Sequence, residues 1–267
     1  MLIKTIIFDL DDTLLWDKKS IATAFENTCK YAAGLQDIDA LELELAVREA
    51  ASQLYASYDT YEFTQLIGIN PFEGLWGTFD DAEAPFGQMK EIIPHYQKEA
   101  WTIGLRKIGI HNAIFGEKLA SKFIEERKKC PFVYDETFSV LEQLKGNYTL
   151  VLLTNGAPSL QNTKLELTPE LTPYFDEIII SGAFGKGKPD PSIFEYVMKR
   201  TGHPADQSLM VGDNLMTDIL GSSRVGIRSV WINREDQPKH NEIHPTYEIN
   251  HLEKLFPILA RLGCIET

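Results

Sequence analysis

The chain has 267 residues, of which 43% are hydrophobic and 24% are charged, as in ordinary globular proteins. Lys and Arg number 26 against 39 Asp and Glu, which gives a formal net charge of −13. This composition excludes a disordered, collagen-like or disulfide-dense chain. An acidic surface repels nucleic acid and anionic membranes and suits divalent cations, so we expect neither a nucleic-acid partner nor a membrane partner.

The cysteines and the first residues bear on the cellular compartment. Cys29, Cys130 and Cys264 form no CxxC pair, and we expect reduced, structural thiols. The first apolar run is interrupted at Asp9 and has no small-residue cleavage site, and no stretch approaches the ~18 apolar residues of a membrane span. We therefore expect a cytoplasmic protein. Its oligomeric state is not readable from the sequence, and monomer is the default.

The first predicted strand, at residues 3–8, is a short apolar run that ends at acidic residues, as a buried parallel strand does. The region 18–130 that follows has a different character. Four of its stretches show the helical spacing of apolar residues: 21–33, 38–58, 86–100 and 112–129. We expect Pro71, Pro85 and Pro94 to divide the region into short helices. A crossover needs only about a dozen residues, so this region is predicted to be an inserted helical cap domain.

From residue 131 onward, apolar runs alternate with helical stretches. The runs are 148–153, 177–180, 208–211 and 228–232, and the helical stretches are 136–144, 158–167, 191–200 and 215–225. This alternation predicts βαβ units, and therefore an α/β core built on a parallel, doubly wound sheet. We assign residues 1–17 and 131–267 to this core and residues 18–130 to the cap domain.

Four short motifs follow predicted strands, at the edge where open α/β sheets bind their ligands. The first is DLDDT at 9–13, in which Asp9 and Asp11 share a face of an extended run. Carboxylates that close repel one another unless a cation bridges them or one holds a proton, so a metal beside a nucleophile and an acid would suit them. The second motif places Thr154 and Asn155 where a hydroxyl and backbone N–H groups can hold an anion.

The third motif is the glycine-rich loop GKGKPDP at 185–191, which can present a lysine to a phosphoryl group. The fourth is GDNLMTD at 212–218, where Asp213 is a hard oxygen ligand of the kind that Mg²⁺ prefers and Asp218 can support it. Each motif taken alone has an ordinary alternative, such as a solvated turn, a surface loop or an acidic helix cap. An acid pair, a hydroxyl, a lysine and a second acid pair at one sheet edge favour a single active site.

With these four motifs the sequence resembles the phosphatase branch of the haloacid dehalogenase (HAD) superfamily. The motifs run from Asp9 to Asp218, and the inserted helical region resembles the C1-type cap of that family. The resemblance implies a Rossmann-like core, Mg²⁺ as cofactor and an aspartyl-phosphate intermediate.

The resemblance also assigns roles to individual residues. Asp9 is the implied nucleophile, and Asp11 is the acid that protonates the leaving oxygen and then activates water. The groups implied to hold the phosphoryl oxygens and offset their charge are Thr154, the Asn155 amide and Lys188, with Lys186 excluded. Mg²⁺ is implied to bind Asp9, the Asp11 backbone carbonyl and Asp213, with Asp218 in support.

The expected function is a Mg²⁺-dependent phosphatase acting on a small phosphorylated metabolite. Candidate substrates are a sugar-acid phosphate, phosphoglycolate, a nucleoside monophosphate or a phosphoamino acid. Asp11 disfavours a dehalogenase, because displacing halide from carbon requires no protonated leaving oxygen. A phosphomutase remains an alternative, as does a non-catalytic phosphate-binding protein, although the latter would be expected to have lost a nucleophile or metal position.

Overall fold

The computed structural model describes residues 2–82 and 84–263. Within these residues no helix is both long and apolar enough to span a membrane. The chain forms two compact units. One comprises residues 1–16, 133–156 and 168–267, and the other comprises residues 17–132 and 157–167. We describe each unit separately.

The first unit, which we call the sheet-based unit, is built on a six-stranded, fully parallel sheet. Its strand order is β3-β2-β1-β4-β5-β6. All four residues of β1 are buried, as expected for a strand hydrogen-bonded on both sides. The predicted α/β fold class is confirmed, and every predicted strand is present. The strands are β1 (Thr5–Phe8), β2 (Thr149–Thr154), β3 (Glu177–Ile180), β4 (Ser208–Gly212), β5 (Arg228–Ile232) and β6 (Tyr247–Ile249).

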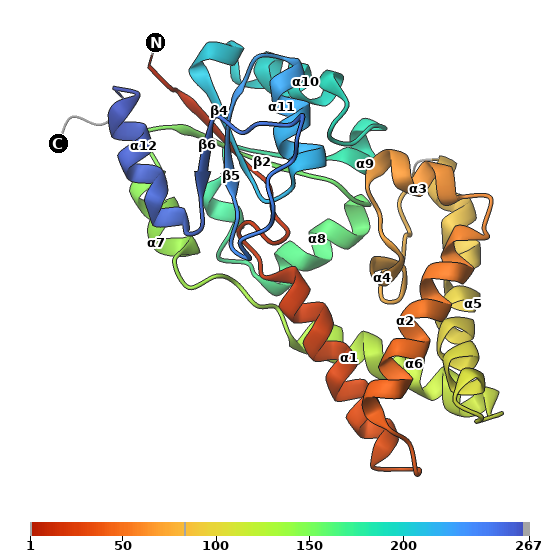
Figure 1. The fold of residues 1–267 in the computed structure, drawn as a ribbon. Helices are drawn as coiled ribbons and strands as arrows, with labels where there is room; N and C mark the ends of the chain where they lie inside the picture. Colours follow the sequence, from red (N-terminus) through yellow and green to blue (C-terminus); the bar gives the residue numbers. More distant parts are fainter. Residues whose placement is uncertain (1, 83, 264–267) are drawn as a thin grey trace. The chain divides into compact units, whose positions relative to one another are not determined.

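Helices cover both faces of this sheet, with α7 and α12 on one side and α10 and α11 on the other (Figure 1). Phe194 and Val197 of α10 pack on Ile7, Val151 and Met210 of the sheet. The helices of this unit are α7 (Thr137–Leu144), α9 (Ser181–Phe184), α10 (Pro191–Thr201), α11 (Leu220–Arg224) and α12 (Leu255–Arg261). Short 3₁₀ turns lie at η1 (Thr172–Tyr174), η2 (Ala205–Gln207) and η4 (Leu252–Lys254).

One predicted helix of this unit divides into two. The stretch 215–225 begins as a π-helix, η3 (Leu215–Ile219), and continues as α11. Wide turns of this kind are frequent at functional sites, and they rotate side chains out of the α-helical register. The π-helix carries Asp218, a residue of the fourth motif.

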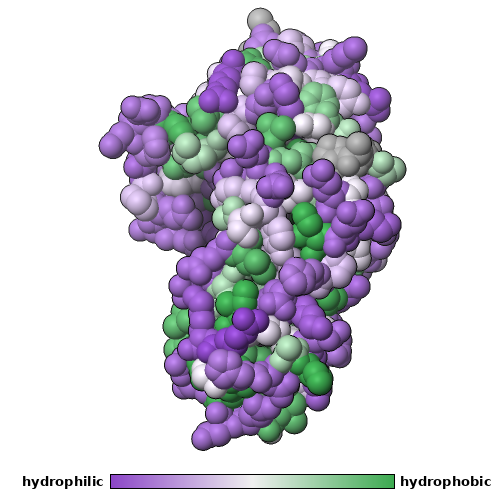
Figure 2. All heavy atoms as spheres, turned by 90° about the vertical axis from the view of Figure 1, so that its right-hand side faces the viewer, coloured by the Kyte–Doolittle hydropathy of each residue, from purple (hydrophilic) through white to green (hydrophobic). Residues whose placement is uncertain are grey.

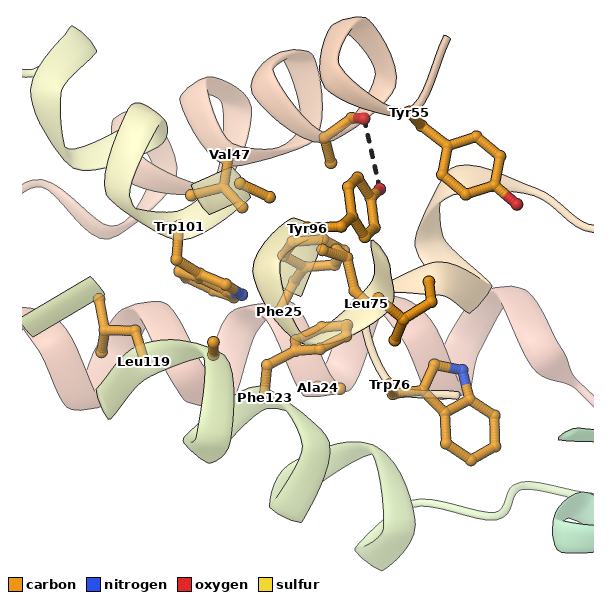
Figure 3. Close-up of a cluster of buried hydrophobic side chains, with 14 of the residues drawn as sticks. Ala24, Phe25, Val47, Tyr55, Leu75, Trp76, Tyr96, Trp101, Leu119 and Phe123 are labelled. Atoms are coloured by element: carbon orange, nitrogen blue, oxygen red, sulfur yellow. Dashed lines mark hydrogen bonds between the residues drawn. The ribbon is translucent and has the colours of Figure 1, made fainter. Parts of the chain in front are cut away.

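In the second unit, the helical unit, every regular element among the described residues is a helix. Its aromatic core includes Phe25, Trp101 and Phe123, whose rings lie 4.6 to 5.9 Å apart between centroids. Figure 3 shows these rings together with Tyr96, whose hydroxyl donates a hydrogen bond to the Ala51 carbonyl at 3.3 Å. The helices are α1 (Asp17–Ala33), α2 (Ala40–Ala56), α3 (Tyr61–Ile67), α4 (Pro71–Gly74), α5 (Ala84–Lys107), α6 (Ala113–Lys129) and α8 (Pro158–Leu167).

The expectation that three prolines divide this region was wrong for Pro94. It lies inside α5, which continues from Ala84 to Lys107. A proline removes one backbone donor from a helix, but the buried side chains of Met89, Ile93 and Tyr96 hold this helix against its neighbours. Pro71 does begin a helix, at the first position of α4.

Helix α8 belongs to the helical unit, although residues 18–130 alone were expected to form the cap. Its Leu160 joins the apolar core of that unit, and its Lys164 forms a buried ion pair with Glu73 of α4, with Nζ and Oε1 2.9 Å apart. The boundaries proposed from the sequence for core and cap stay a prediction.

Cys29 and Cys130 are free and buried, whereas Cys264 lies outside the described residues. The face shown in Figure 2 is largely hydrophilic, with small hydrophobic areas between the polar side chains.

Candidate active site

The first motif begins where the central strand ends. Asp9 follows β1 directly, and its backbone N–H donates to the carbonyl of Val211 on β4 at 3.0 Å. The side chain of Asp9 is mostly buried, with 8% of the residue exposed. Because β1 lies between β2 and β4, the residues that follow these three parallel strands meet at one edge of the sheet.

Lys188 extends its side chain to the same point. Its Nζ lies 2.6 Å from Asp9 Oδ1 and 2.7 Å from Asp218 Oδ1, and it also donates to the Leu153 carbonyl at 2.7 Å. The ammonium group is therefore buried between two carboxylates and a backbone oxygen. A buried charge is tolerated when it is paired and hydrogen-bonded, and this one has three partners.

Burial and neighbouring charges act differently on the pKa values of Asp9 and Lys188. The pKa of Asp9 is raised to about 7: burial is the largest cause, Lys188 opposes it, and the charges of Asp218 and Asp11 add to the rise. Burial tends to lower the pKa of Lys188, but the carboxylates of Asp218 and Asp9 more than compensate and raise it above its ordinary value. The lysine therefore stays charged at neutral pH, while the carboxylate of Asp9 needs further positive charge to be fully ionised.

Asn155 determines the course of the lysine loop. Its Nδ2 donates to the Lys188 carbonyl at 2.8 Å, and the Lys188 N–H donates to its Oδ1 at 2.8 Å. The neighbouring Lys186 is more than half exposed and pairs with Asp190, at 3.4 Å between Nζ and Oδ2. Of the two lysines in the loop, the structure brings Lys188 to Asp9.

The second motif lies at the end of β2. Thr154 is the last residue of that strand and is fully buried. The N–H of Gly156 donates to Ser181 Oγ at 2.8 Å, and Gly156 has a φ of 141°. Only glycine adopts such a φ readily, so the bend after Thr154 depends on this residue. Sequence analysis did not identify Ser181, because nothing near it in the chain marks it as a partner of this turn.

Asp213 and Asp218 bring two more carboxylates to the site. Carboxylate oxygens of Asp9, Asp213 and Asp218 lie within 4.8 Å of one another, a group that could hold a metal ion. A Cβ at Gly212 would lie 2.3 Å from the Asp218 carboxylate, so this position requires glycine. Asp218 Oδ2 accepts a hydrogen bond from the N–H of Asn214 at 3.1 Å.

Trp231 of β5 supports the backbone of this motif. Its indole Nε1 donates to the carbonyl of Asp213 at 2.7 Å, and the ring is buried. The sequence marked Trp231 only as a member of an apolar strand. A tryptophan facing a polar loop is a weak signal by itself, since the indole N–H of most buried tryptophans finds some acceptor.

Asp11 lies on the turn that follows Asp9. It is half-buried, and it pairs with Leu15 across the turn in an isolated bridge. Asp12 between them has a φ of 59°, a left-handed conformation that Asp tolerates better than most residues. The carboxylate of Asp11 is near enough to contribute to the raised pKa of Asp9.

All the predicted site residues thus lie in the sheet-based unit. Among the described residues, the potential metal-binding group includes the Asp218 carboxylate, which was expected only in support. It does not include the side chain of Asp11, for which a backbone ligand was expected. The roles of these residues stay predictions.

Comparison with known proteins gives the family of this fold and site. A family model described as haloacid dehalogenase-like hydrolase matches residues 3–226. A phosphoserine phosphatase from Thermus thermophilus is 30% identical over 259 residues, which cover 95% of this chain and 98% of that protein. The pyrimidine 5′-nucleotidase YjjG of Escherichia coli is 34% identical over 146 residues, covering 54% of this chain and 64% of that one.

A solved structure agrees with these sequence matches. The HAD-hydrolase YfnB of Bacillus subtilis, crystallised with magnesium, has a TM-score of 0.67 and 25% identity and covers 97% of this chain and 99% of its own. The predicted family and enzyme class are confirmed. The chain belongs to the haloacid dehalogenase-like hydrolases and is an enzyme of the phosphoric monoester hydrolase class.

Proposed function

We propose that the protein is a Mg²⁺-dependent phosphatase that hydrolyses a small phosphorylated metabolite through an aspartyl-phosphate on Asp9. The observation that carries this proposal is the placement of Lys188 Nζ 2.6 Å from the carboxylate of Asp9, which is one of three carboxylates whose oxygens lie within 4.8 Å of one another. Phosphoryl transfer depends mainly on positioning and on neutralising negative charge, and this arrangement provides groups for both.

The donor set fits Mg²⁺. The carboxylates of Asp9, Asp213 and Asp218 supply only hard oxygen donors, and the raised pKa of Asp9 indicates a carboxylate that a further cation would stabilise. We assign Asp9, the Asp11 carbonyl and Asp213 as ligands, with Asp218 adjacent. When bound, the ion supplies the positive charge that allows an anionic ester to approach an anionic nucleophile.

In the proposed reaction, a carboxylate oxygen of Asp9 attacks phosphorus and the bond to the leaving oxygen breaks. Asp11 gives its proton to that oxygen, so the leaving group departs as an alcohol. Thr154 and the Asn155 amide hold the phosphoryl oxygens while Lys188 offsets their charge. Water then attacks the phosphorus of the aspartyl-phosphate and gives a proton to Asp11, which releases inorganic phosphate and restores Asp9.

The relatives guide the choice of substrate. One relative that matches nearly the whole chain is a phosphoserine phosphatase, and another, which matches about half of it, is a pyrimidine 5′-nucleotidase. We therefore propose phosphoserine as the first substrate to test and pyrimidine nucleoside monophosphates as the second, followed by phosphoglycolate and sugar-acid phosphates.

The test is release of inorganic phosphate from this panel, with Mg²⁺ and with EDTA. We expect release that requires Mg²⁺ and is abolished in Asp9→Asn, since Asn has nearly the same shape but is not a nucleophile. The matched control is Asp37→Asn, because Asp37 is an exposed aspartate between α1 and α2. No release from any ester, or undiminished release by Asp9→Asn, would contradict the proposal.

A further inference from the structure

Arg234 follows β5 and turns its guanidinium group inward, leaving 13% of the side chain exposed. Its Nη1 donates to Glu136 Oε1 at 2.7 Å, and its Nη2 donates to the Thr13 carbonyl at 3.1 Å. The guanidinium carbon Cζ lies over the Tyr134 ring, 3.5 Å from its centre. Three segments far apart in the chain, around residues 13, 135 and 234, thus meet at one side chain.

One of these contacts reaches the turn that carries the proposed nucleophile and acid. Thr13, whose carbonyl Arg234 binds, is fully buried, and its hydroxyl donates to Asp9 Oδ2 at 3.3 Å. The turn between Asp9 and Thr13 contains Asp12 at a φ of 59°. A left-handed residue other than glycine costs roughly 1–2 kcal/mol, and such a turn persists only where surrounding contacts hold it.

The same group of residues holds the rest of the turn. The Leu14 carbonyl accepts a hydrogen bond from the N–H of Tyr134 at 3.2 Å and another from the Thr137 hydroxyl at 3.0 Å. The ring of Trp16 stacks on Tyr134 at 5.2 Å between centroids and 17° between planes. Arg234 therefore lies on one side of a ring that also contacts the far end of the turn.

Glu136 keeps the guanidinium in this orientation. The residue is 7% exposed, and burial alone would raise its pKa, but the hydrogen bond from Arg234 and backbone donors such as the Leu252 N–H hold the pKa below its ordinary value. An ionised, buried partner restricts the arginine far more than an exposed one does.

We infer that Arg234 is a positioning residue for the proposed hydrolysis: it fixes the turn of residues 10–16, and through Thr13 it sets the orientation of Asp9 and Asp11. This inference rests on the proposed function. Small displacements of reacting groups are costly, so losing this support should reduce turnover more than it reduces substrate binding.

The experiment compares Arg234→Ala and Arg234→Lys with wild type. The matched control is Arg200→Ala, because Arg200 is a half-exposed arginine of the same unit that pairs with Glu177 at 2.7 Å. We expect kcat of Arg234→Ala to fall by about 10- to 100-fold while KM changes little, with partial recovery in tens of millimolar guanidinium. Arg234→Lys should be more thermally stable than Arg234→Ala, but its kcat should stay low. An ammonium group cannot reproduce the planar fork that binds Glu136 and Thr13 together.

Hydrogen exchange of the peptide covering residues 10–16 gives a readout that needs no substrate. We expect faster exchange in Arg234→Ala, and unchanged exchange in Arg200→Ala. Unchanged exchange in Arg234→Ala overturns the inference, as does an unchanged kcat once wild-type turnover is established. If wild type releases no phosphate, the proposed function fails, and exchange alone then decides whether Arg234 holds the turn.

Discussion

Asn155 and Lys188 exchange two hydrogen bonds, each 2.8 Å long, between the amide of the first residue and the backbone of the second. These bonds connect the turn after β2 to the lysine loop, although the two residues are 33 positions apart in the chain. The geometry of the lysine beside Asp9 depends on this pair, because Lys188 is otherwise carried by a glycine-rich loop.

A double-mutant cycle tests this dependence. Asn155→Ala should cost about 1–2 kcal/mol of stability through the two lost hydrogen bonds, and it should reduce kcat. Gly187→Ala should also destabilise the protein, because its new Cβ would lie 2.7 Å from Asn155 Oδ1. In the double variant that clash is gone. The double variant should therefore be destabilised by less than the sum of the two single destabilisations. Urea unfolding of the four proteins measures the coupling, and simple additivity would contradict this account.

The same substitution at two positions of α5 should have opposite effects. A Cβ at Gly104 would lie 2.4 Å from Val47 Cγ2 and 2.9 Å from its Cα, whereas a Cβ at Gly87 would meet nothing within 4 Å. We expect Gly104→Ala to destabilise the protein by about 1–3 kcal/mol, since α2 and α5 must separate. Gly87→Ala should stabilise it by roughly 0.5–1 kcal/mol through helix propensity. Thermal denaturation of both variants tests this prediction. Melting temperatures that shift in the same direction in both variants would contradict it.

The buried ion pair of Lys164 and Glu73 should be sensitive to loss of one partner. Both side chains are less than 5% exposed, and Asp17 lies 4.0 Å from the same Nζ. Lys164→Met removes the cation that pairs with the buried carboxylate of Glu73, which should cost about 3–5 kcal/mol, whereas Asp17 keeps its ion pair with Arg127. Combining it with Glu73→Gln should recover part of this loss.

The comparison for that experiment is an exposed pair in the same unit. Lys129 and Glu125 are each more than half exposed, so Lys129→Met should change stability far less than Lys164→Met does. Chemical denaturation gives both values. Equal losses of stability in Lys164→Met and Lys129→Met would show that burying the first pair does not increase its contribution to stability.

Acid should selectively weaken the contact between Glu136 and Arg234. The folded-state pKa of Glu136 lies below its ordinary value of 4.5, so its contribution to stability is complete above that value and is lost as pH falls through the folded pKa. Glu136→Gln should therefore be less stable than wild type at pH 7, and the two stabilities should converge in acid.

The measurement is the melting temperature of wild type and Glu136→Gln from neutral to acidic pH. His251 Nε2 lies 3.6 Å from Glu136 Oε2, so His251→Gln separates its contribution. A difference between wild type and Glu136→Gln that stays constant into acid would mean that ionisation of Glu136 is not the source of the stability.

Much of the sheet could be predicted because its strands are short apolar runs that end at polar motifs. Two predicted strands, 177–180 and 228–232, have the bounds found in the structure. The helix at 158–167 also has its predicted bounds, but its place in the helical unit could not be predicted. Local periodicity gives the type of an element, whereas the surface on which the element packs depends on distant residues.

The proposed chemical groups were recognisable because each belongs to a short local motif. The groups that support them were not, since their partners are remote: Arg234 lies 221 residues from Thr13 and 98 from Glu136. In the sequence Arg234 is a single arginine in a polar stretch. Lys164 is similar, because a lysine in an amphipathic helix is expected to face solvent, and only the folded structure reveals Glu73 opposite it.

The membership of α8 in the helical unit has a consequence for recombining this protein with its relatives. The chain passes from one unit to the other four times, since residues 157–167 leave the sheet-based unit and return to it. A chimera that exchanges residues 17–132 alone would keep the host's Leu160 and Lys164 against a foreign helical core. An exchange of the helical unit should therefore carry both segments, so that the donor's unit arrives with its own α8.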